Sequence, residues 1–141
     1  MPLAPSGVDK FLGNGLRVLV VEDDCDAAAS SVALLRLWGH QPWLAHDGPA
    51  ALDLAEQEAP DVILLDIGLP RMDGYQIARA LRAKRPCKRP VLIAVTGYGA
   101  PQDRQQSYEA GMDLHLVKPV DPGELLHILN QLSSIVGAAR H

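Results

Sequence analysis

The chain has few cysteines and few aromatic residues, and it has no long apolar run. Its two cysteines, Cys25 and Cys87, stand far apart and form no Cys-x-x-Cys pair, so the sequence indicates neither a zinc site nor a disulfide framework. Such cysteine usage fits a reducing cytoplasm. No stretch approaches membrane-spanning length, and the first residues do not combine a basic region with an apolar one. We therefore expect a soluble cytoplasmic protein with no membrane contact.

Positive charge is also scarce. The chain carries 13 Lys and Arg residues against 17 Asp and Glu, a formal net charge of -4. This balance excludes the basic footprint of a protein that binds nucleic acid directly or an anionic membrane. Basic residues concentrate only at 79–89, where Pro86 and Pro90 interrupt the segment, and we interpret it as a solvated helix end. A length of 141 residues fits one domain.

Four short apolar runs are each followed by a polar residue. Each run is continuous and rich in Leu and β-branched residues, which is typical of a buried strand. The segments between them have helical spacing, so the pattern predicts a parallel sheet flanked by helices. In such sheets ligands bind beyond the carboxyl ends of the strands. The residues delivered to that edge are Glu22, Asp23 and Asp24 after 16–21, Asp66 after 62–65, Thr96 after 91–95, and Lys118 after 114–117.

Strands and helices alternate five times along the chain. We expect strands at 16–21, 41–45, 62–65, 91–95 and 114–117, and helices at 26–38 with Asp26 as N-cap, 49–58, 75–83, 102–110 and from 121 to about 136. Right-handed crossovers place helices on both faces. The expected fold is therefore α/β, a doubly wound five-stranded parallel sheet of order 2-1-3-4-5. Residues 1–15 are expected to form an arm or linker, 16–137 the domain and 138–141 a tail.

This strand order brings three carboxylates together. With the first and third strands adjacent, Glu22, Asp23 and Asp66 converge, and like charges raise one another's pKa. A bound divalent cation resolves that conflict. Ligands that offer only oxygen suit Mg²⁺ or Mn²⁺, whereas this edge lacks the histidine and thiol ligands that zinc prefers.

Four motifs resemble those of the receiver (response-regulator) domain of two-component signalling. They are Val-Val-Glu-Asp at 20–23, Leu-Leu-Asp-Ile-Gly-Leu-Pro-Arg-Met-Asp-Gly at 64–74, Val-Thr-Gly at 95–97, and Lys-Pro at 118–119. They follow the family's order and spacing across about residues 16–136. The resemblance implies a (βα)5 flavodoxin-like fold, and the phrase at 114–121 is closest in style to receivers attached to hybrid histidine kinases.

The resemblance also implies a role for each matched residue. Asp66 would be the phosphoacceptor, and Glu22, Asp23, Asp66 and the backbone carbonyl of Gly68 would hold Mg²⁺. Thr96 would hydrogen-bond the phosphoryl group, and Lys118 would pair with it across a cis peptide bond to Pro119. The phosphodonor would be a histidine kinase or a histidine phosphotransfer domain. A downstream partner of unknown identity would contact the face made by the helix at 102–110, the strand at 114–117 and the last helix.

One position departs from the family. His115 stands where many receivers carry Tyr or Phe, a ring that couples to the threonine during switching. The swing of this ring is therefore smaller, absent or pH-sensitive here, and the sequence leaves these alternatives open. A pseudo-receiver that acts only as an interaction module is the alternative function. We expect autocatalytic phosphoryl transfer and self-dephosphorylation rather than turnover of a separate substrate. Asp24 is interpreted as a helix-entry residue, and His40, His46, His127 and His141 as surface or loop residues.

Overall fold

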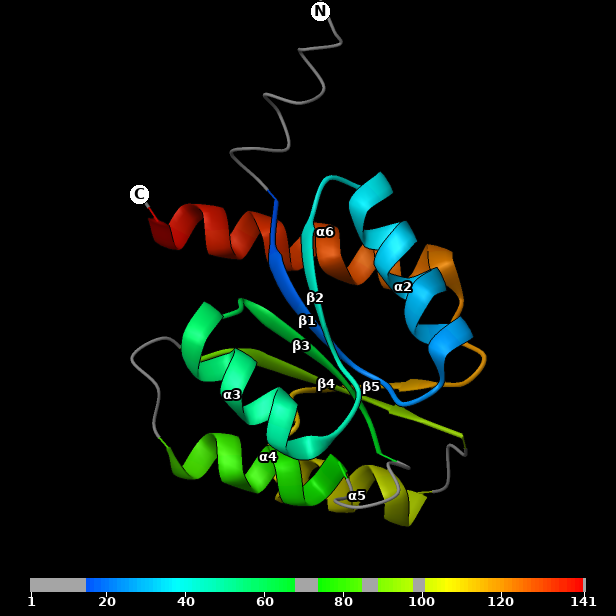
Figure 1. The fold of residues 1–141 in the computed structure, drawn as a ribbon, viewed down its shortest axis with the longest axis vertical. Coiled ribbons are helices and arrows are strands. Elements are labelled where there is room, and N and C mark those ends of the chain that lie inside the picture. The colour runs from blue at the N-terminus through cyan, green and yellow to red at the C-terminus, as the bar shows by residue number, and fades with distance from the viewer. Residues whose placement is uncertain (1–14, 68–73, 85–88, 98–100, 141) are drawn as a thin grey trace, which may run out of the picture.

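Five strands form one parallel sheet in the order β2-β1-β3-β4-β5 (Figure 1). The computed structural model describes residues 15–67, 74–84, 89–97 and 101–140, with the backbone alone described at 101–104 and 137–140. The strands are β1 (Arg17–Val21), β2 (Gln41–Ala45), β3 (Val62–Asp66), β4 (Val91–Thr96) and β5 (Leu114–Val117). The expected doubly wound sheet and its strand order are confirmed.

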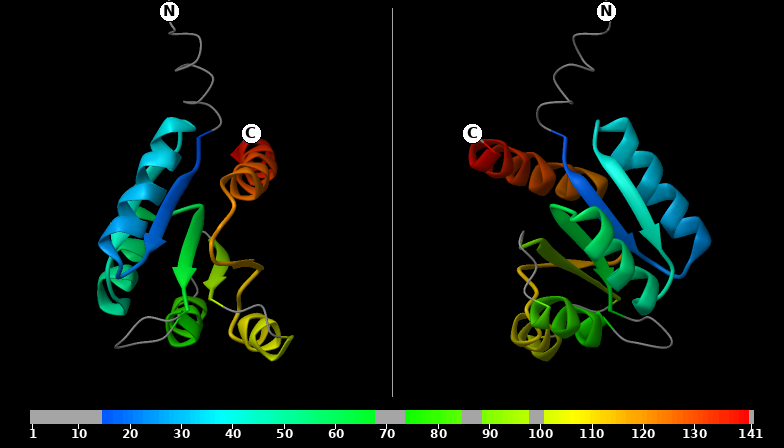
Figure 2. Two further views of the ribbon diagram at one scale, coloured as in Figure 1. Left: turned by 90° about the vertical axis from the view of Figure 1, so that its right-hand side faces the viewer. Right: turned by 60° about the vertical axis from the view of Figure 1, so that its left-hand side comes forward.

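Helices cover both faces of this sheet (Figures 1 and 2). On one face lie α2 and α6, and on the other lie α3, α4 and α5. The helices are α2 (Cys25–Leu37), α3 (Gly48–Glu58), α4 (Gly74–Ala83), α5 (Pro101–Glu109) and α6 (Pro122–Arg140). Helix α6 continues through Arg140, so three of the residues expected as a tail are helical. Among the described residues, no helix is long and apolar enough to cross a membrane.

Alternate residues of the strands pack into two separate hydrophobic cores, one on each face of the sheet. In β1, Leu19 and Val21 pack toward α3 and α4, whereas Val18 and Val20 pack toward α2 and α6. Because successive side chains of a strand point to opposite faces, a sheet covered on both sides needs apolar residues at every position. This requirement explains the continuous apolar runs of the sequence.

The first turn of α2 corrects one expectation. Its N-cap is Asp24, whose side chain accepts hydrogen bonds from the backbone N–H groups of Asp26 and Ala27 at 2.9 and 3.0 Å. Asp26, the expected cap, instead lies inside the first turn. Its negative charge there interacts favourably with the positive end of the helix dipole. The N-cap therefore lies two residues earlier in the chain than the sequence predicted, directly after Asp23.

Gly74 sets the junction between β3 and α4. A Cβ at this position would lie 2.8 Å from Ile67 Cα and 3.0 Å from the carbonyl oxygen of Asp66. The Gly74 N–H also donates to the carbonyl oxygen of Ile67 at 3.1 Å. Only glycine permits this approach of helix to strand end, and the approach fixes the backbone of Asp66.

His40 lies in the loop before β2, consistent with its interpretation as a surface or loop residue, but its side chain is buried rather than at the surface. It lies between α2 and β2, and its Nδ1 accepts a hydrogen bond from the Leu16 N–H at 3.0 Å. Burial lowers the pKa of this imidazole, because desolvation disfavours its charged form. His40 therefore anchors the entry of the chain into β1.

Candidate functional site

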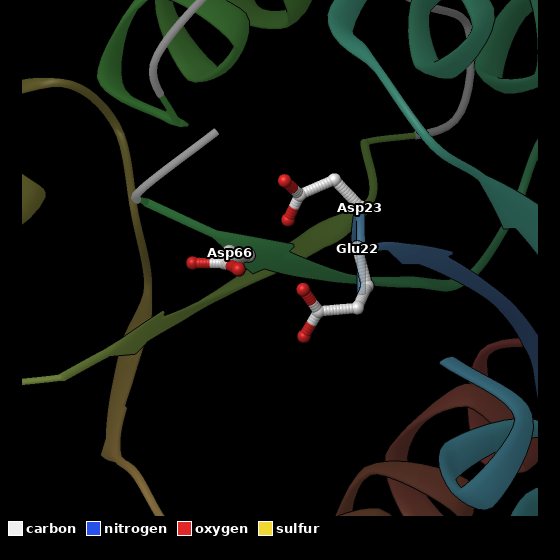
Figure 3. A group of neighbouring side chains, drawn as sticks. All are labelled: Glu22, Asp23 and Asp66. Atoms are coloured by element: carbon white, nitrogen blue, oxygen red, sulfur yellow. The ribbon is translucent and has the colours of Figure 1, made fainter. Parts of the chain in front are cut away.

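Three carboxylates meet at the carboxyl edge of the sheet, as the sequence predicted (Figure 3). Glu22 and Asp23 follow β1, and Asp66 is the last residue of β3, the neighbouring strand. One oxygen from each of the three side chains lies within 4.8 Å of the other two. Asp23 is exposed while Glu22 and Asp66 are buried. The set opens to solvent on the Asp23 side.

Lys118 lies beside these carboxylates. Its Nζ is 3.0 Å from Asp66 Oδ2 and 3.8 Å from Glu22 Oε1. Burial disfavours the lysine charge, but the hydrogen bond and charge of Asp66, together with the charge of Glu22, outweigh it and raise the pKa of Lys118. The Lys118–Pro119 peptide bond is cis, as the resemblance implied. The ammonium of Lys118 thus faces Asp66, the residue on which the resemblance would place the phosphoryl group.

Glu22 is the member of the cluster whose negative charge is electrostatically unfavourable. Burial, followed by the hydrogen bond and the charge of Asp66, raises its pKa to about 7. Its backbone is firmly placed, because the Glu22 N–H donates to the Ala45 carbonyl of β2 at 3.0 Å. His46 Nδ1 lies 3.1 Å from the Glu22 carbonyl oxygen. The protein therefore holds Glu22 against Asp66 at an electrostatic cost that a bound cation would offset.

The donor set fits a hard divalent cation. Three carboxylates on fixed strand ends offer oxygen ligands alone, which matches Mg²⁺ or Mn²⁺. Histidine and thiol ligands are absent from this cluster among the described residues. Gly68, the expected source of a backbone ligand, lies outside the described residues.

Thr96 and His115 form a second pair at the same edge. Thr96 ends β4 and is buried, and its Oγ1 lies 3.0 Å from His115 Nε2. The two side chains share a face of the sheet, because Ala94 and His115 are register partners across β4 and β5. The Thr96 hydroxyl is thus held by the imidazole. Which group donates depends on the protonation of the ring.

His46 was missed as a neighbour of the site. The sequence placed it in a loop, but it follows β2 directly and reaches the Glu22 backbone. Its position just after a strand of the same sheet was the available signal. The strand at 41–45 was expected with these bounds, but no role was assigned to the residue that follows it.

The chain is similar to known response regulators. A family profile described as "Response regulator receiver domain" matches residues 18–130. The transcriptional regulatory protein PrrA of Mycobacterium tuberculosis is 43% identical over 110 residues, which are 78% of this chain and 46% of PrrA. An uncharacterized 14.6 kDa protein of Leptolyngbya boryana is 33% identical over 114 residues, 81% of this chain and 87% of that protein. The chain spans about half the length of PrrA.

Solved structures show the same fold. The receiver domain of a sensor histidine kinase from Pseudomonas aeruginosa, with a magnesium ion coordinated in its active site cleft, is 36% identical with a TM-score of 0.77. That match covers 85% of this chain and 98% of the other. The chemotaxis protein CheY4 of Vibrio cholerae is 29% identical with a TM-score of 0.79, and covers 84% of this chain and 98% of its own.

Proposed function

The chain belongs to the response regulator receiver family, and from that premise we propose that it accepts a phosphoryl group on Asp66 in a His-to-Asp phosphorelay. The observation that carries the proposal is the convergence of Glu22, Asp23 and Asp66 within 4.8 Å, with Lys118 Nζ 3.0 Å from Asp66. The phosphodonor is a histidine kinase or a histidine phosphotransfer domain. The family and the cysteine usage support a cytoplasmic location.

In the proposed reaction an Asp66 carboxylate oxygen attacks phosphorus. A P–O bond forms, the bond from phosphorus to the donor's histidine nitrogen breaks, and that nitrogen keeps the electron pair. Glu22, Asp23 and Asp66, with the Gly68 carbonyl, would hold Mg²⁺, which when bound supplies positive charge to the transferring phosphoryl oxygens. Phosphoryl transfer depends mainly on positioning and charge neutralisation. The chain itself contributes both through the fixed strand ends and Lys118.

Lys118 changes partner in this scheme. In the resting state its ammonium lies 3.0 Å from Asp66 and 3.8 Å from Glu22 and offsets part of the negative charge of the cluster. Its side chain is 41% exposed, so the long apolar stem can swing the charge toward a phosphoryl oxygen as it arrives. The same ammonium then stabilises the acyl phosphate.

We further propose that Thr96 and His115 transmit the change. A phosphoryl group adds about -1.5 to -2 charge and three acceptor oxygens. A Thr96 hydroxyl that donates to them can no longer donate to His115, so the imidazole must turn or become the donor. His115 lies on β5, which follows α5 and precedes α6 in the chain, and the side chains of Tyr108 on α5 and Val117 on β5 are exposed. The face made by α5, β5 and α6 is therefore the proposed surface for the downstream partner.

Intact mass after incubation with acetyl phosphate and Mg²⁺ tests the transfer. Wild type gains one phosphoryl adduct, which chelation of Mg²⁺ prevents. Asp66→Ala gains none, because the attacking oxygen is gone, while Asp53→Ala, which removes an exposed carboxylate on α3, behaves as wild type. Failure of wild type to gain the adduct, or an equal adduct on Asp66→Ala, favours the pseudo-receiver.

Backbone NMR with beryllofluoride and Mg²⁺ tests the switch in the same protein. Shifts should extend from Asp66 through β5 into α5 and α6, and Thr96→Ala should confine them to the site. Shifts that stay near Asp66 in wild type would refute the switching face and leave phosphorylation intact.

A further inference from the structure

A pocket of about 660 Å³ lies between α2 and α6 and opens at the acidic edge. We call it the α2–α6 pocket. Its floor is apolar and consists of Val20, Leu64 and Leu116, from β1, β3 and β5. Leu34 of α2 and Leu125 of α6 close its two sides. Pockets of about 300 to 1,000 Å³ with apolar walls and a few polar groups are typical of small-molecule sites.

The pocket exists because α2 presents small side chains toward it. Ala27, Ser30 and Ser31 occupy consecutive turns on the side of α2 that faces the pocket. A leucine at any of these positions would reach across the opening toward the opposite wall. These small side chains leave the space open once α2 packs against the sheet, and Ser30 and Ser31 add hydroxyl groups to an otherwise apolar wall.

The mouth of the pocket has one sign of charge in excess. Among the described residues that line it, three carry carboxyl groups, Glu22, Asp24 and Asp66, and one is an ammonium, Lys118. Burial and the neighbouring Asp66 raise the pKa of Glu22 to about 7, but Asp24 and Asp66 still outnumber the single ammonium when Glu22 is protonated. That ammonium already lies 3.0 Å from Asp66 and 3.8 Å from Glu22. An incoming anion would meet the remaining negative charge, while a cation would complement it.

We propose that the α2–α6 pocket binds small amphipathic cations. The ammonium or amidinium head lies at the mouth against Glu22 and Asp24, and the apolar body lies on Val20, Leu64 and Leu116. Burial of the body supplies most of the affinity, and the mouth selects the sign of charge.

Binding has a consequence for phosphorylation of Asp66, which rests on the proposed function. Glu22 and Asp66 belong to both the pocket mouth and the carboxylate cluster. A cationic head at Glu22 therefore competes with a divalent cation for the same oxygens. An amine of this class inhibits phosphorylation of Asp66 by excluding Mg²⁺.

Backbone NMR of the metal-free protein, without phosphodonor, tests the binding by itself. The probe is 2-phenylethylamine. The matched anion is 3-phenylpropionate, which has the same ring and linker, and methylamine is the head alone. The amine should give saturable shifts at Val20, Leu64 and Leu116 with a dissociation constant on the order of millimolar, the strength expected for so small a ligand. Methylamine and the anion should bind at least about tenfold more weakly. Methylamine lacks the apolar body, and 3-phenylpropionate lacks the cationic head.

Two leucine variants of α2 locate the probe. Ala27→Leu fills the pocket and should weaken amine binding by about tenfold or more. Ala29→Leu makes the same change at an exposed position of the same helix that does not line the pocket, and should bind as wild type. Saturating Mg²⁺ should raise the apparent dissociation constant of the amine. Equal or tighter binding of the anion, no saturable amine shifts, or equal amine binding by the two leucine variants would overturn the proposal, whatever the outcome of the phosphorylation test.

Discussion

The two ends of the same sheet use buried polar residues in opposite ways. At the amino end, Asp61 Oδ2 accepts from the Arg17 N–H at 2.8 Å, and His40 Nδ1 accepts from the Leu16 N–H at 3.0 Å. Both side chains satisfy the backbone where β1 begins. At the carboxyl end, Glu22 and Asp66 turn toward each other. The polar side chains of the amino end bind backbone groups, whereas those of the carboxyl end bring like charges together.

Asp113 and Asp66 show the contrast in two single residues. Asp113 Oδ2 accepts from the Leu92 N–H at 2.9 Å and from Arg82 at 2.8 Å, and its Oδ1 accepts from Arg89 at 3.0 Å. These partners lie on three segments that the carboxylate joins. Asp66 instead faces a half-exposed lysine and two other carboxylates. Asp113 is the more exposed of the two, with 26% of its side chain accessible against 8% for Asp66, and its partners are cations and a backbone N–H where those of Asp66 include like charges.

Removal of a carboxylate from the carboxyl end should have the largest effect. Asp23→Ala should weaken Mg²⁺ binding by about a hundredfold or more, because hard-cation affinity follows the charge and number of oxygen ligands. Calorimetric titration measures it, and Asp53→Ala serves as the exposed control. The same variant should leave the free energy of unfolding of the metal-free protein unchanged or higher, since it relieves repulsion. Identical titrations of wild type and Asp23→Ala would rule out this metal site.

At the amino end, Arg82→Ala should cost stability and spare the metal site. Arg82 donates to the carbonyl oxygens of Gly111 and Pro90 as well as to Asp113. Loss of these charged hydrogen bonds should lower the free energy of unfolding by about 2 kcal/mol. Urea denaturation measures the loss. Lys84→Ala, which breaks an exposed pair with Glu56 at 3.6 Å, should stay within about 0.5 kcal/mol of wild type.

A change in pH should alter the free energy of unfolding in opposite directions through Glu22 at the carboxyl end and His40 at the amino end. Glu22 should give the larger change. Its folded pKa is about 7, above the ordinary value of 4.5. The folded metal-free protein therefore binds more protons than the unfolded chain between these values. The contribution of Glu22 to the free energy of unfolding should be fully present below about pH 4.5 and should be lost as the pH rises to about 7. Urea denaturation of Glu22→Gln should lack this component; a slope equal to that of wild type would contradict it.

His40 should give a smaller change in the opposite direction. Its folded pKa lies below the ordinary 6.5, so the unfolded chain binds more protons as the medium becomes acidic. The contribution should be present above pH 6.5 and disappear as the pH falls through the lower folded pKa. His40→Gln keeps an acceptor for the Leu16 N–H and does not titrate. The difference in stability between wild type and this variant should therefore shrink toward acidic pH, which the same denaturation series would show.

Much of the carboxyl edge could be predicted from the sequence because it depends on strand ends. Val20 and Val21 precede Glu22, and Leu64 and Leu65 precede Asp66, so pattern and strand order together bring the carboxylates to one place. The burial of His40 at the amino end could not be predicted from the sequence. His40 is a single histidine beside a glycine, and only the packing of α2 on the sheet turns it inward.

The sequence by itself determined where the strands lie, the order of the sheet, and which carboxylates and lysine meet, because apolar periodicity and parallel topology depend on local pattern and chain length. The tertiary structure decided what depends on distance between elements. It buried His40 against Leu16, joined Thr96 to His115 and left the α2–α6 pocket open. Contacts of this kind arise from the relative positions of packed helices and strands, and no periodicity in the chain records them.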